Sequence, residues 1–256
     1  MHPGAITGYI DVAQLVLYAF WLFFAGLIFY LRREDKREGY PLISERSGHV
    51  KVQGFPAVPR PKTFRLPHGG TVSAPRAEPR DNRPILAKPI GAWLGAPLQP
   101  TGNPMQDAVG PAAYAEREDQ PELTFDGRPL IVPMRVETEA TVAAEDADPR
   151  GMTVIGADGR PGGTVQDLWI DRSEPQIRYL EIAVADGRSV LLPMTLARIQ
   201  GAKRQVKVSS VLGAQVAGAP AIASPDQVTK LEEDRICAYF ASGHLYATPA
   251  RQEPLL

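Results

Sequence analysis

Carboxylate side chains are grouped with arginines in the C-terminal half of the chain. Asp171 and Glu174 follow a predicted strand, with Arg178 a few residues further on, and Glu233 lies in an acidic run over residues 232–234. Carboxylates held close together spread their pKa values by mutual repulsion. Such a group can pass protons near neutral pH if it lines a wet path to a buried acceptor. On chemistry alone, a solvated charged surface is the alternative.

The sequence contains no recognisable motif of the residue types that usually build an active site. The four histidines have no metal-ligand spacing, and no G-x-S-x-G nucleophile motif occurs. The glycine pairs at residues 69–70 and 162–163 lack the flanking residues of a phosphate-binding loop. Cys237 is the one cysteine, which excludes an intramolecular disulfide, and we expect it to be a buried, inert thiol. The sequence therefore indicates no catalytic site and no metal site.

The carboxylates must be positioned by a β domain that begins near residue 150. Short alternating or apolar runs predict strands, and Asp-Gly pairs and a glycine separate them. The predicted strands cover residues 164–171, 177–184, 189–193 and 205–209. Short strands at this spacing predict a small antiparallel barrel or sandwich.

A helix is predicted after these strands. Ser224 is a candidate N-cap, Pro225 stands at the first helical position and Gln227 completes a capping box. Gly243 is the expected stop signal. Three apolar residues fall roughly on one stripe of this helix, and they are Val228, Leu231 and Ile236.

An apolar segment near the N-terminus predicts a membrane span over residues 12–31. It has one polar side chain, Gln14, and no charge, and a helix of this length spans about 30 Å. Apolar residues on every face argue against the core helix of a soluble protein. A cleavable signal peptide should begin with basic residues, but none precedes Arg32. The basic cluster at residues 32–37 predicts that the N-terminus is outside and the bulk of the chain cytoplasmic.

The stretch between the span and the β domain is rich in proline. Residues 41–133 hold 16 of the 25 prolines, together with many large apolar residues. We expect an extended strap that becomes ordered by lying on another surface, and a partly disordered linker is the alternative. Beyond residue 31 the chain carries 28 basic and 28 acidic residues, since Asp11 is the one charge before it. This balance argues against a nucleic-acid partner.

Long segments of the chain resemble the H subunit of the purple-bacterial photosynthetic reaction centre. The segments that carry this resemblance are DVAQLVLYAFW and LRREDKREGYPL at the membrane span, PKTFRLPHGGTV at residues 61–72, PTGNPMQDAVGPAAYAERED at residues 100–119 and LEEDRICAYFASGHLYATP at residues 231–249. The resemblance covers essentially the whole chain.

The resemblance implies a fold class and a place in the cell. We expect a single transmembrane α-helix and a mainly β cytoplasmic domain with a PRC-type small antiparallel barrel. The chain would lie in the bacterial inner (photosynthetic, chromatophore) membrane. The expected parts are a periplasmic tail (1–11), the transmembrane helix (12–31), the Pro-rich strap (32–149), the barrel (150–215) and a C-terminal helix with a tail (216–256).

The resemblance also implies partners and cofactors. The H subunit caps the L and M subunits, which hold bacteriochlorophyll, bacteriopheophytin, quinones and the non-haem iron. It shields the quinone sites and helps to conduct protons to the secondary quinone. A cytochrome subunit, a light-harvesting antenna ring and membrane lipids are further possible neighbours.

Residue roles follow from the matching positions. LWIDRSEPQIRYLE matches the family stretch near the secondary quinone, which implies proton transfer through Asp171 and Glu174 with Arg178 as a nearby cation. Glu233 matches a further acidic member. Some family members carry an Asp and two His in the loop after Pro-Glu-Leu, where this chain has Thr124, Asp126 and Arg128. Asp126 is therefore a candidate for proton entry, whereas an entry gated by histidine is not expected, because arginine stays charged.

Two other classes of function remain open at this point. The chain could be a membrane-anchored PRC-barrel adaptor unrelated to photochemistry, or a tethered enzyme with an unrecognised active site. The neutral charge of the cytoplasmic part argues against an adaptor for RNA or ribosomes.

Overall fold

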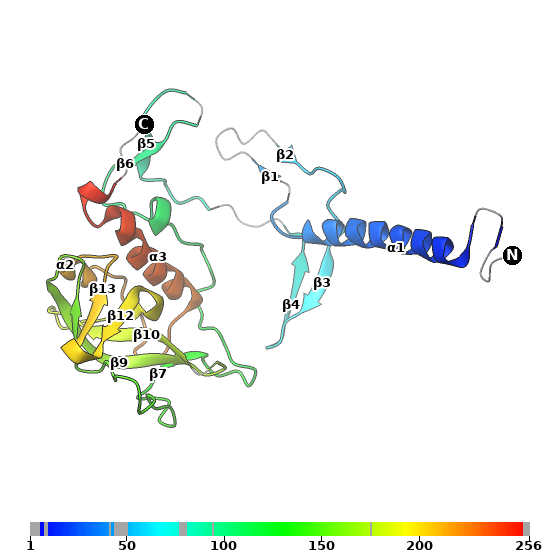
Figure 1. The fold of residues 1–256 in the computed structure, drawn as a ribbon. Helices are drawn as coiled ribbons and strands as arrows, with labels where there is room; N and C mark the ends of the chain where they lie inside the picture. Colours follow the sequence, from blue (N-terminus) through cyan, green and yellow to red (C-terminus); the bar gives the residue numbers. More distant parts are fainter. Residues whose placement is uncertain are drawn as a thin grey trace. The chain divides into compact units, whose positions relative to one another are not determined.

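The computed structural model of this chain describes residues 6–7, 10–40, 42–43, 51–76, 81–93, 95–174 and 176–252. The chain forms two units that divide between residues 80 and 81. The first unit contains the long helix α1, and the second contains a seven-stranded sheet and helix α3 (Figure 1).

Helix α1 runs over Val12–Asp35, so it continues four residues beyond the predicted apolar span. Its start is fixed by a capping box, in which Asp11 Oδ1 accepts from the Gln14 N–H at 2.8 Å and the Gln14 side chain accepts from the Asp11 N–H. No residue of α1 is buried within the chain. Among the described residues, α1 is the one helix long and apolar enough to cross a membrane.

The polar end of α1 is fixed to the segment that follows it. Lys36 is buried, and its Nζ donates to the carbonyl oxygens of Gln53 and Pro56 at 2.5 and 2.6 Å. A buried ammonium group needs such acceptors, because desolvation would otherwise disfavour its charge. Arg37 donates to the carbonyls of Arg60 and Ala74 at 2.8 and 2.9 Å. The helix exit and the residues after it therefore form one structured body.

The described part of the first unit also contains two short antiparallel strand pairs. Strand β1 (Leu42–Ile43) pairs with β2 (Lys51–Val52), and β3 (Lys62–Arg65) pairs with β4 (Thr71–Ala74). Glu34 of α1 accepts from Lys62 of β3 at 2.6 Å. The predicted strap thus begins with local structure next to the helix exit.

The second unit is built on one twisted sheet. Its strand order is β11-β10-β9-β8-β13-β12, and β7 pairs with the end of β9 beyond β8. All pairs are antiparallel except β8 with β13. The strands are β7 (Ile131–Pro133), β8 (Thr153–Ile155), β9 (Pro161–Asp171), β10 (Gln176–Ala183), β11 (Ser189–Pro193), β12 (Ala197–Gln200) and β13 (Gln205–Val208).

The four predicted strands correspond to β9, β10, β11 and β13. The sequence prediction missed β7, β8 and β12, because runs of three or four residues are too short to display an alternating pattern. The prediction of purely antiparallel pairing is wrong for β8 and β13. The mainly β domain itself is confirmed.

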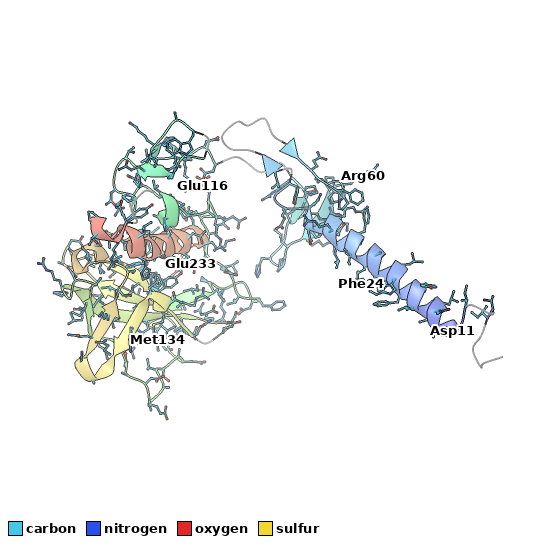
Figure 2. All side chains as sticks on the ribbon, turned by 45° about the horizontal axis from the view of Figure 1, so that its top comes forward. Asp11, Phe24, Arg60, Glu116, Met134 and Glu233 are labelled. Atoms are coloured by element: carbon cyan, nitrogen blue, oxygen red, sulfur yellow. The ribbon has the colours of Figure 1, made fainter. Side chains whose placement is uncertain are left out.

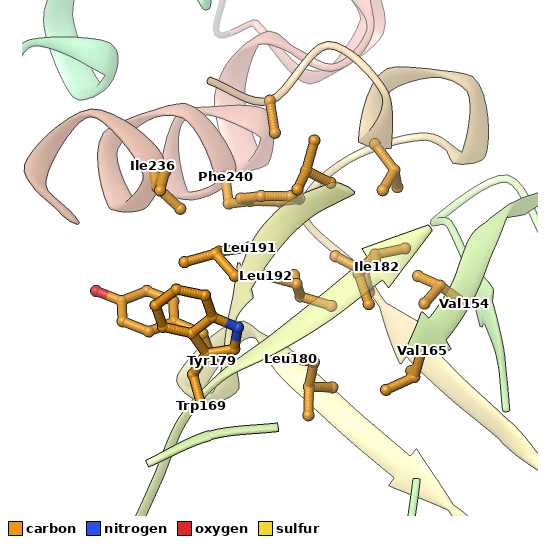
Figure 3. Close-up of a cluster of buried hydrophobic side chains, with 14 of the residues drawn as sticks. Val154, Val165, Trp169, Tyr179, Leu180, Ile182, Leu191, Leu192, Ile236 and Phe240 are labelled. Atoms are coloured by element: carbon orange, nitrogen blue, oxygen red, sulfur yellow. The ribbon is translucent and has the colours of Figure 1, made fainter. Parts of the chain in front are cut away.

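A hydrophobic core fills the space between the sheet and helix α3 (Lys230–Tyr246). Ile236 and Phe240 of α3 lie over Leu191 and Leu192 of β11, and all four are fully buried (Figure 3). A short helix, α2 (Gly213–Val216), packs against β9. Four 3-10 turns complete the regular structure: η1 (Gly110–Ala112), η2 (Met194–Leu196), η3 (Gly201–Lys203) and η4 (Pro249–Arg251).

The start of α3 differs from the sequence prediction. Its N-cap is Thr229, whose Oγ1 accepts from the Glu232 N–H at 3.1 Å while the Glu232 carboxylate accepts from the Thr229 N–H at 2.8 Å. This Thr-x-x-Glu box uses a carboxylate, and Glu232 also accepts from the Ala223 N–H at 2.6 Å. Ser224 instead accepts a local bond from the Asp226 N–H. The predicted cap at Ser224 is therefore wrong.

The end of α3 also differs. Gly243, the predicted stop, lies inside the helix. An added Cβ there would lie 2.5 Å from the carbonyl oxygen of Ser210. Gly243 is thus explained by the close approach of α3 to the chain after β13, and not by helix termination.

Part of the predicted strap is ordered by the chain's own helix. Residues 81–149 belong to the second unit and contain one hairpin, β5 (Ala87–Pro89) with β6 (Leu98–Pro100). The 3-10 turn η1 packs on α3. Glu118 then accepts from Lys230 at 2.5 Å, and Asp119 accepts from the Thr229 hydroxyl at 2.7 Å. These bonds connect the stretch to the start of α3.

Candidate functional site

Asp171 lies at the end of β9, where the sheet turns into β10. The residue is buried, with 5% of its surface exposed. Its Oδ1 accepts from the backbone N–H groups of Ser173 and Glu174 at 2.9 and 3.1 Å. The tight β9–β10 turn therefore holds the carboxylate in place through the backbone.

Arg178 reaches Asp171 because of a bulge in β10. The register of β10 on β9 shifts between Ile177 and Tyr179, which leaves Arg178 as the extra residue. Its Nη1 lies 3.4 Å from Asp171 Oδ2. The exposed Glu174 accepts from Gln176 Nε2 at 3.3 Å in the same turn. The structure thus brings together three of the five predicted residues, Asp171, Glu174 and Arg178. Asp171 is buried, whereas Glu174 is exposed to solvent.

Glu233 lies on α3 (Figure 2), and its hydrogen bond with Tyr179 of β10 shows that it faces the sheet. It is buried, with 8% exposed, and its carboxylate accepts from the Tyr179 hydroxyl at 2.8 Å. Burial raises the pKa of Glu233, with a smaller contribution from the charge of Glu122 in the same direction. The Tyr179 hydrogen bond and the positive charges of Arg178 and Arg117 oppose this rise. Arg178 therefore acts electrostatically on both Asp171 and Glu233.

Tyr179 is a fixed donor within this group. Burial raises the pKa of its hydroxyl far above the ordinary value, so the group stays neutral and keeps its proton. The neighbouring Cys237 is exposed, which corrects the expectation of a buried thiol. Its sulfur lies 3.8 Å from the Tyr179 oxygen, and desolvation raises the pKa of the thiol. Cys237 is therefore a protonated thiol at neutral pH.

Asp126 lies apart from this group, in the loop before β7. In the described part of the chain its hydrogen bonds stay within its own loop, where it accepts from Thr124 Oγ1 at 2.5 Å and Arg128 Nε at 2.6 Å. These bonds, first that of Thr124 and then that of Arg128, lower the pKa of Asp126. The exposed carboxylate is thus ionised at neutral pH. Its negative charge can attract protons, but the carboxylate stays deprotonated at that pH.

A second carboxylate pair was missed by the sequence analysis. Asp167 and Glu181 stand directly opposite each other on β9 and β10, and both are buried. Arg135 Nη1 donates to both, at 3.1 and 2.6 Å, and the Trp169 indole N–H donates to Glu181 at 2.9 Å. The available signal was the acidic residue within each of two otherwise apolar runs, DLWI and YLEIAV. This cluster fastens the residues after β7 to the sheet.

The described residues include no group of three or more His, Cys, Asp or Glu side chains able to hold a metal ion. The two described histidines, His68 and His244, are exposed. The described arrangement brings together carboxylates with arginines and a tyrosine hydroxyl.

Comparison with protein families decides between the remaining interpretations. The family model described as "Photosynthetic reaction centre, H-chain N-terminal region" matches residues 4–136, which is more than half of the chain. The chain belongs to the reaction-centre H-chain family. A second model, the PRC-barrel domain, matches residues 141–215 of this H chain. The second match covers β8 to β13, so the predicted PRC-type fold is confirmed.

Membership in this family establishes the general role of the chain. It is a structural subunit of a photosynthetic reaction centre and associates with other subunits of that complex. Together with the apolar helix α1, the family makes it a membrane-anchored subunit.

Proposed function

We propose that this H chain caps the cytoplasmic side of the L and M subunits, stabilises their quinone sites and conducts protons to the secondary quinone. The photochemistry itself belongs to the partners. In this proposal they hold the bacteriochlorophyll, bacteriopheophytin, quinones and non-haem iron, and this chain ligates none of them.

The proposed orientation rests on the flanks of α1. Residues 1–31 contain no Lys or Arg, whereas Arg32, Arg33, Lys36 and Arg37 follow the apolar span. By the positive-inside rule, the N-terminus is periplasmic and both hairpins and the sheet are cytoplasmic. The membrane in question is the photosynthetic inner membrane.

The observation that carries the proton-transfer role is the ion pair between the buried Asp171 and the exposed Arg178, whose charge also acts on Glu233. Glu174 is the exposed member and takes protons from water. Glu233 has a raised pKa, so it exchanges protons closer to neutral pH than an ordinary glutamate. Arg178 lies beside Asp171 and its positive charge limits the repulsion between the carboxylates.

Asp126 has a different part in this proposal. Because Thr124 and Arg128 hold it as an anion, it serves as an electrostatic attractor near the surface and not as a carrier. A histidine gate is not expected in this loop, since arginine occupies one of the positions where relatives carry histidine.

Purification of a C-terminally tagged chain from gently solubilised membranes tests the proposal. We expect the product to show near-infrared bands of bacteriochlorophyll and bacteriopheophytin that bleach reversibly in light. The same cells carrying an untagged chain are the matched control and should yield no pigment. A colourless tagged product from pigmented cells would contradict the proposal.

A further inference from the structure

The loop before β7 presents a large apolar side chain wholly to solvent. Phe125 is 99% exposed, the highest value among the exposed large apolar residues of the described chain. By comparison, Phe55 is 84% exposed, and the centroid of its ring lies 5.7 Å from that of the Phe29 ring. Single exposed apolar residues are common on protein surfaces, but they usually keep part of their surface covered.

The backbone of this loop is rigidly built. The Gly127 N–H donates to the Thr124 carbonyl at 2.9 Å, which closes a β-turn with Phe125 at its tip. Thr124 is buried, and its N–H donates to the Arg128 carbonyl at 2.8 Å. Gly127 has a φ of +80°, which the turn requires and a side chain would disfavour. Phe125 is therefore displayed by a fixed turn and not by a loose loop.

The base of the loop is fastened to the strand that ends in Asp171. Leu130 donates to the Glu122 carbonyl at 2.7 Å, which closes the loop. Arg172 donates from its N–H to the Leu130 carbonyl at 3.0 Å and from Nη1 to the Pro129 carbonyl at 2.9 Å. Since Arg172 follows Asp171 directly, a partner that holds this loop also fixes the position of the carboxylate group. The loop and the β9–β10 turn lie at the same end of the sheet (Figure 1).

The place of the loop in the sequence indicates which partner it meets. Residues 122–130 lie within the stretch matched by the reaction-centre H-chain model and outside the PRC-barrel match, which begins at residue 141. The loop is therefore part of the region characteristic of reaction-centre H chains.

We infer that Phe125 is a docking anchor, which inserts its ring into an apolar pocket on a core polypeptide of the reaction centre. This inference rests on the proposed function, because it deepens the contact with the core subunits. A rigid aromatic residue loses little conformational entropy when it is buried, and such residues dominate the affinity of many protein interfaces. Docking at Phe125 would fix the positions of Asp171 and Glu174 relative to the partner.

The test is the affinity of the full-length chain for reaction-centre cores from which this chain has been removed. Phe125→Ala should weaken binding about 30-fold, which corresponds to the lower limit of an interface hot spot. Phe125→Leu should lose less than about fivefold, since it keeps much of the apolar surface. Arg160→Ala is the control, because Arg160 has an 82% exposed side chain in the same unit but lies outside the H-chain match, and it should alter binding less than about twofold.

The melting temperatures of the unbound variants distinguish a loss of docking from a loss of folding. Because the Phe125 side chain packs against nothing within the chain, Phe125→Ala should leave the melting temperature unchanged. Binding of this variant within twofold of the unmodified chain would overturn the inference. If the unmodified chain itself fails to bind pigmented cores, the proposed function fails instead.

Photo-crosslinking identifies the occupant directly. With p-benzoylphenylalanine in place of Phe125, illumination of the assembled membranes should join this chain to a core polypeptide. Crosslinking to lipid or to an antenna polypeptide, or no crosslink at all, would overturn the assignment.

Discussion

The Tyr179 hydroxyl donates a 2.8 Å hydrogen bond to the Glu233 carboxylate, and this bond joins the sheet to α3. Both side chains are buried, so the bond lies at the junction of the two layers of the second unit. The bulge that aims Arg178 at Asp171 immediately precedes Tyr179 in β10. The bulge in β10 therefore lies between two contacts of the proposed proton path, that of Arg178 with Asp171 and that of Tyr179 with Glu233.

Tyr179→Phe tests this relationship. The hydroxyl lowers the pKa of Glu233, so its removal should raise that pKa further and cost about 1–3 kcal/mol of stability by leaving a buried acceptor unpaired. The pKa can be followed by the carboxyl infrared band during a pH titration. Tyr239→Phe is the matched control, because the Tyr239 hydroxyl donates at 2.7 Å to the Gln215 carbonyl instead. An equal shift of the Glu233 band in both variants would contradict the assignment.

The raised pKa of Glu233 also predicts how stability depends on pH. In the unfolded chain this pKa returns to its ordinary value of 4.5. Below that value the carboxyl is neutral in both states, and folding is not penalised. As the pH rises from 4.5 through the raised folded value, the unfolded chain releases the proton first, so the free energy of unfolding falls.

Glu233→Gln removes this contribution, so its stability relative to the unmodified chain should be higher at pH 8 than at pH 4. Urea unfolding at the two pH values, followed by circular dichroism, measures the difference. Glu145→Gln, a change of an exposed carboxylate in the same unit, is the control and should show no such trend. A pH-independent difference for Glu233→Gln would show that its folded pKa is not raised.

The sequence predicted the elements whose signals are local and long. The apolar span over residues 12–31 and the alternating runs of β9 and β10 correspond to observed elements. The start of α3 was misplaced because Ser224-Pro225 and Thr229 both resemble caps. The choice between them depends on Glu232, which ties the preceding loop to the helix through Ala223, a tertiary contact that no local pattern displays.

The candidate site was predicted unevenly for a similar reason. Asp171, Glu174 and Arg178 are near neighbours in the sequence, so one turn brings them together. The pair of Asp167 and Glu181 depends on strand register, and their shared Arg135 comes from a distant segment. That these two charged residues are buried opposite each other can be predicted only when the register of β9 and β10 is known.

Arg135→Ala should therefore be more damaging than its exposure suggests. It leaves Asp167 and Glu181 buried without their cation, and such a loss typically costs about 3–5 kcal/mol. Because the Arg135 side chain is 39% exposed, we expect about 2–3 kcal/mol in urea unfolding.

Two further variants make this prediction specific. Arg178→Ala should cost about 1 kcal/mol or less, since Asp171 keeps two backbone donors. Adding Glu181→Gln to Arg135→Ala should recover part of the lost stability by removing one unpaired charge. Equal costs for the two arginine variants would contradict the distinction between the two clusters.

The proposed topology predicts a protease pattern in membrane vesicles. In inside-out vesicles, where the cytoplasmic face is accessible, protease should remove most of the chain beyond α1. In right-side-out vesicles the same treatment should leave the second unit intact, because the basic residues after the span keep that side cytoplasmic. Immunodetection of a C-terminal tag distinguishes the two results, and the opposite pattern would reverse the topology.

Glu174→Gln tests the proton path itself. Glu174 is the exposed carboxylate of the Asp171 group, so its loss should slow proton delivery without disturbing the Asp171–Arg178 ion pair. We expect the second, proton-coupled electron transfer to the quinone to slow by about tenfold or more, a modest share of what a positioned proton donor contributes. The first electron transfer, which needs no proton uptake by the quinone, should keep its rate in flash kinetics. Glu145→Gln should leave both steps unchanged, whereas an unaltered second step in Glu174→Gln would remove Glu174 from the path.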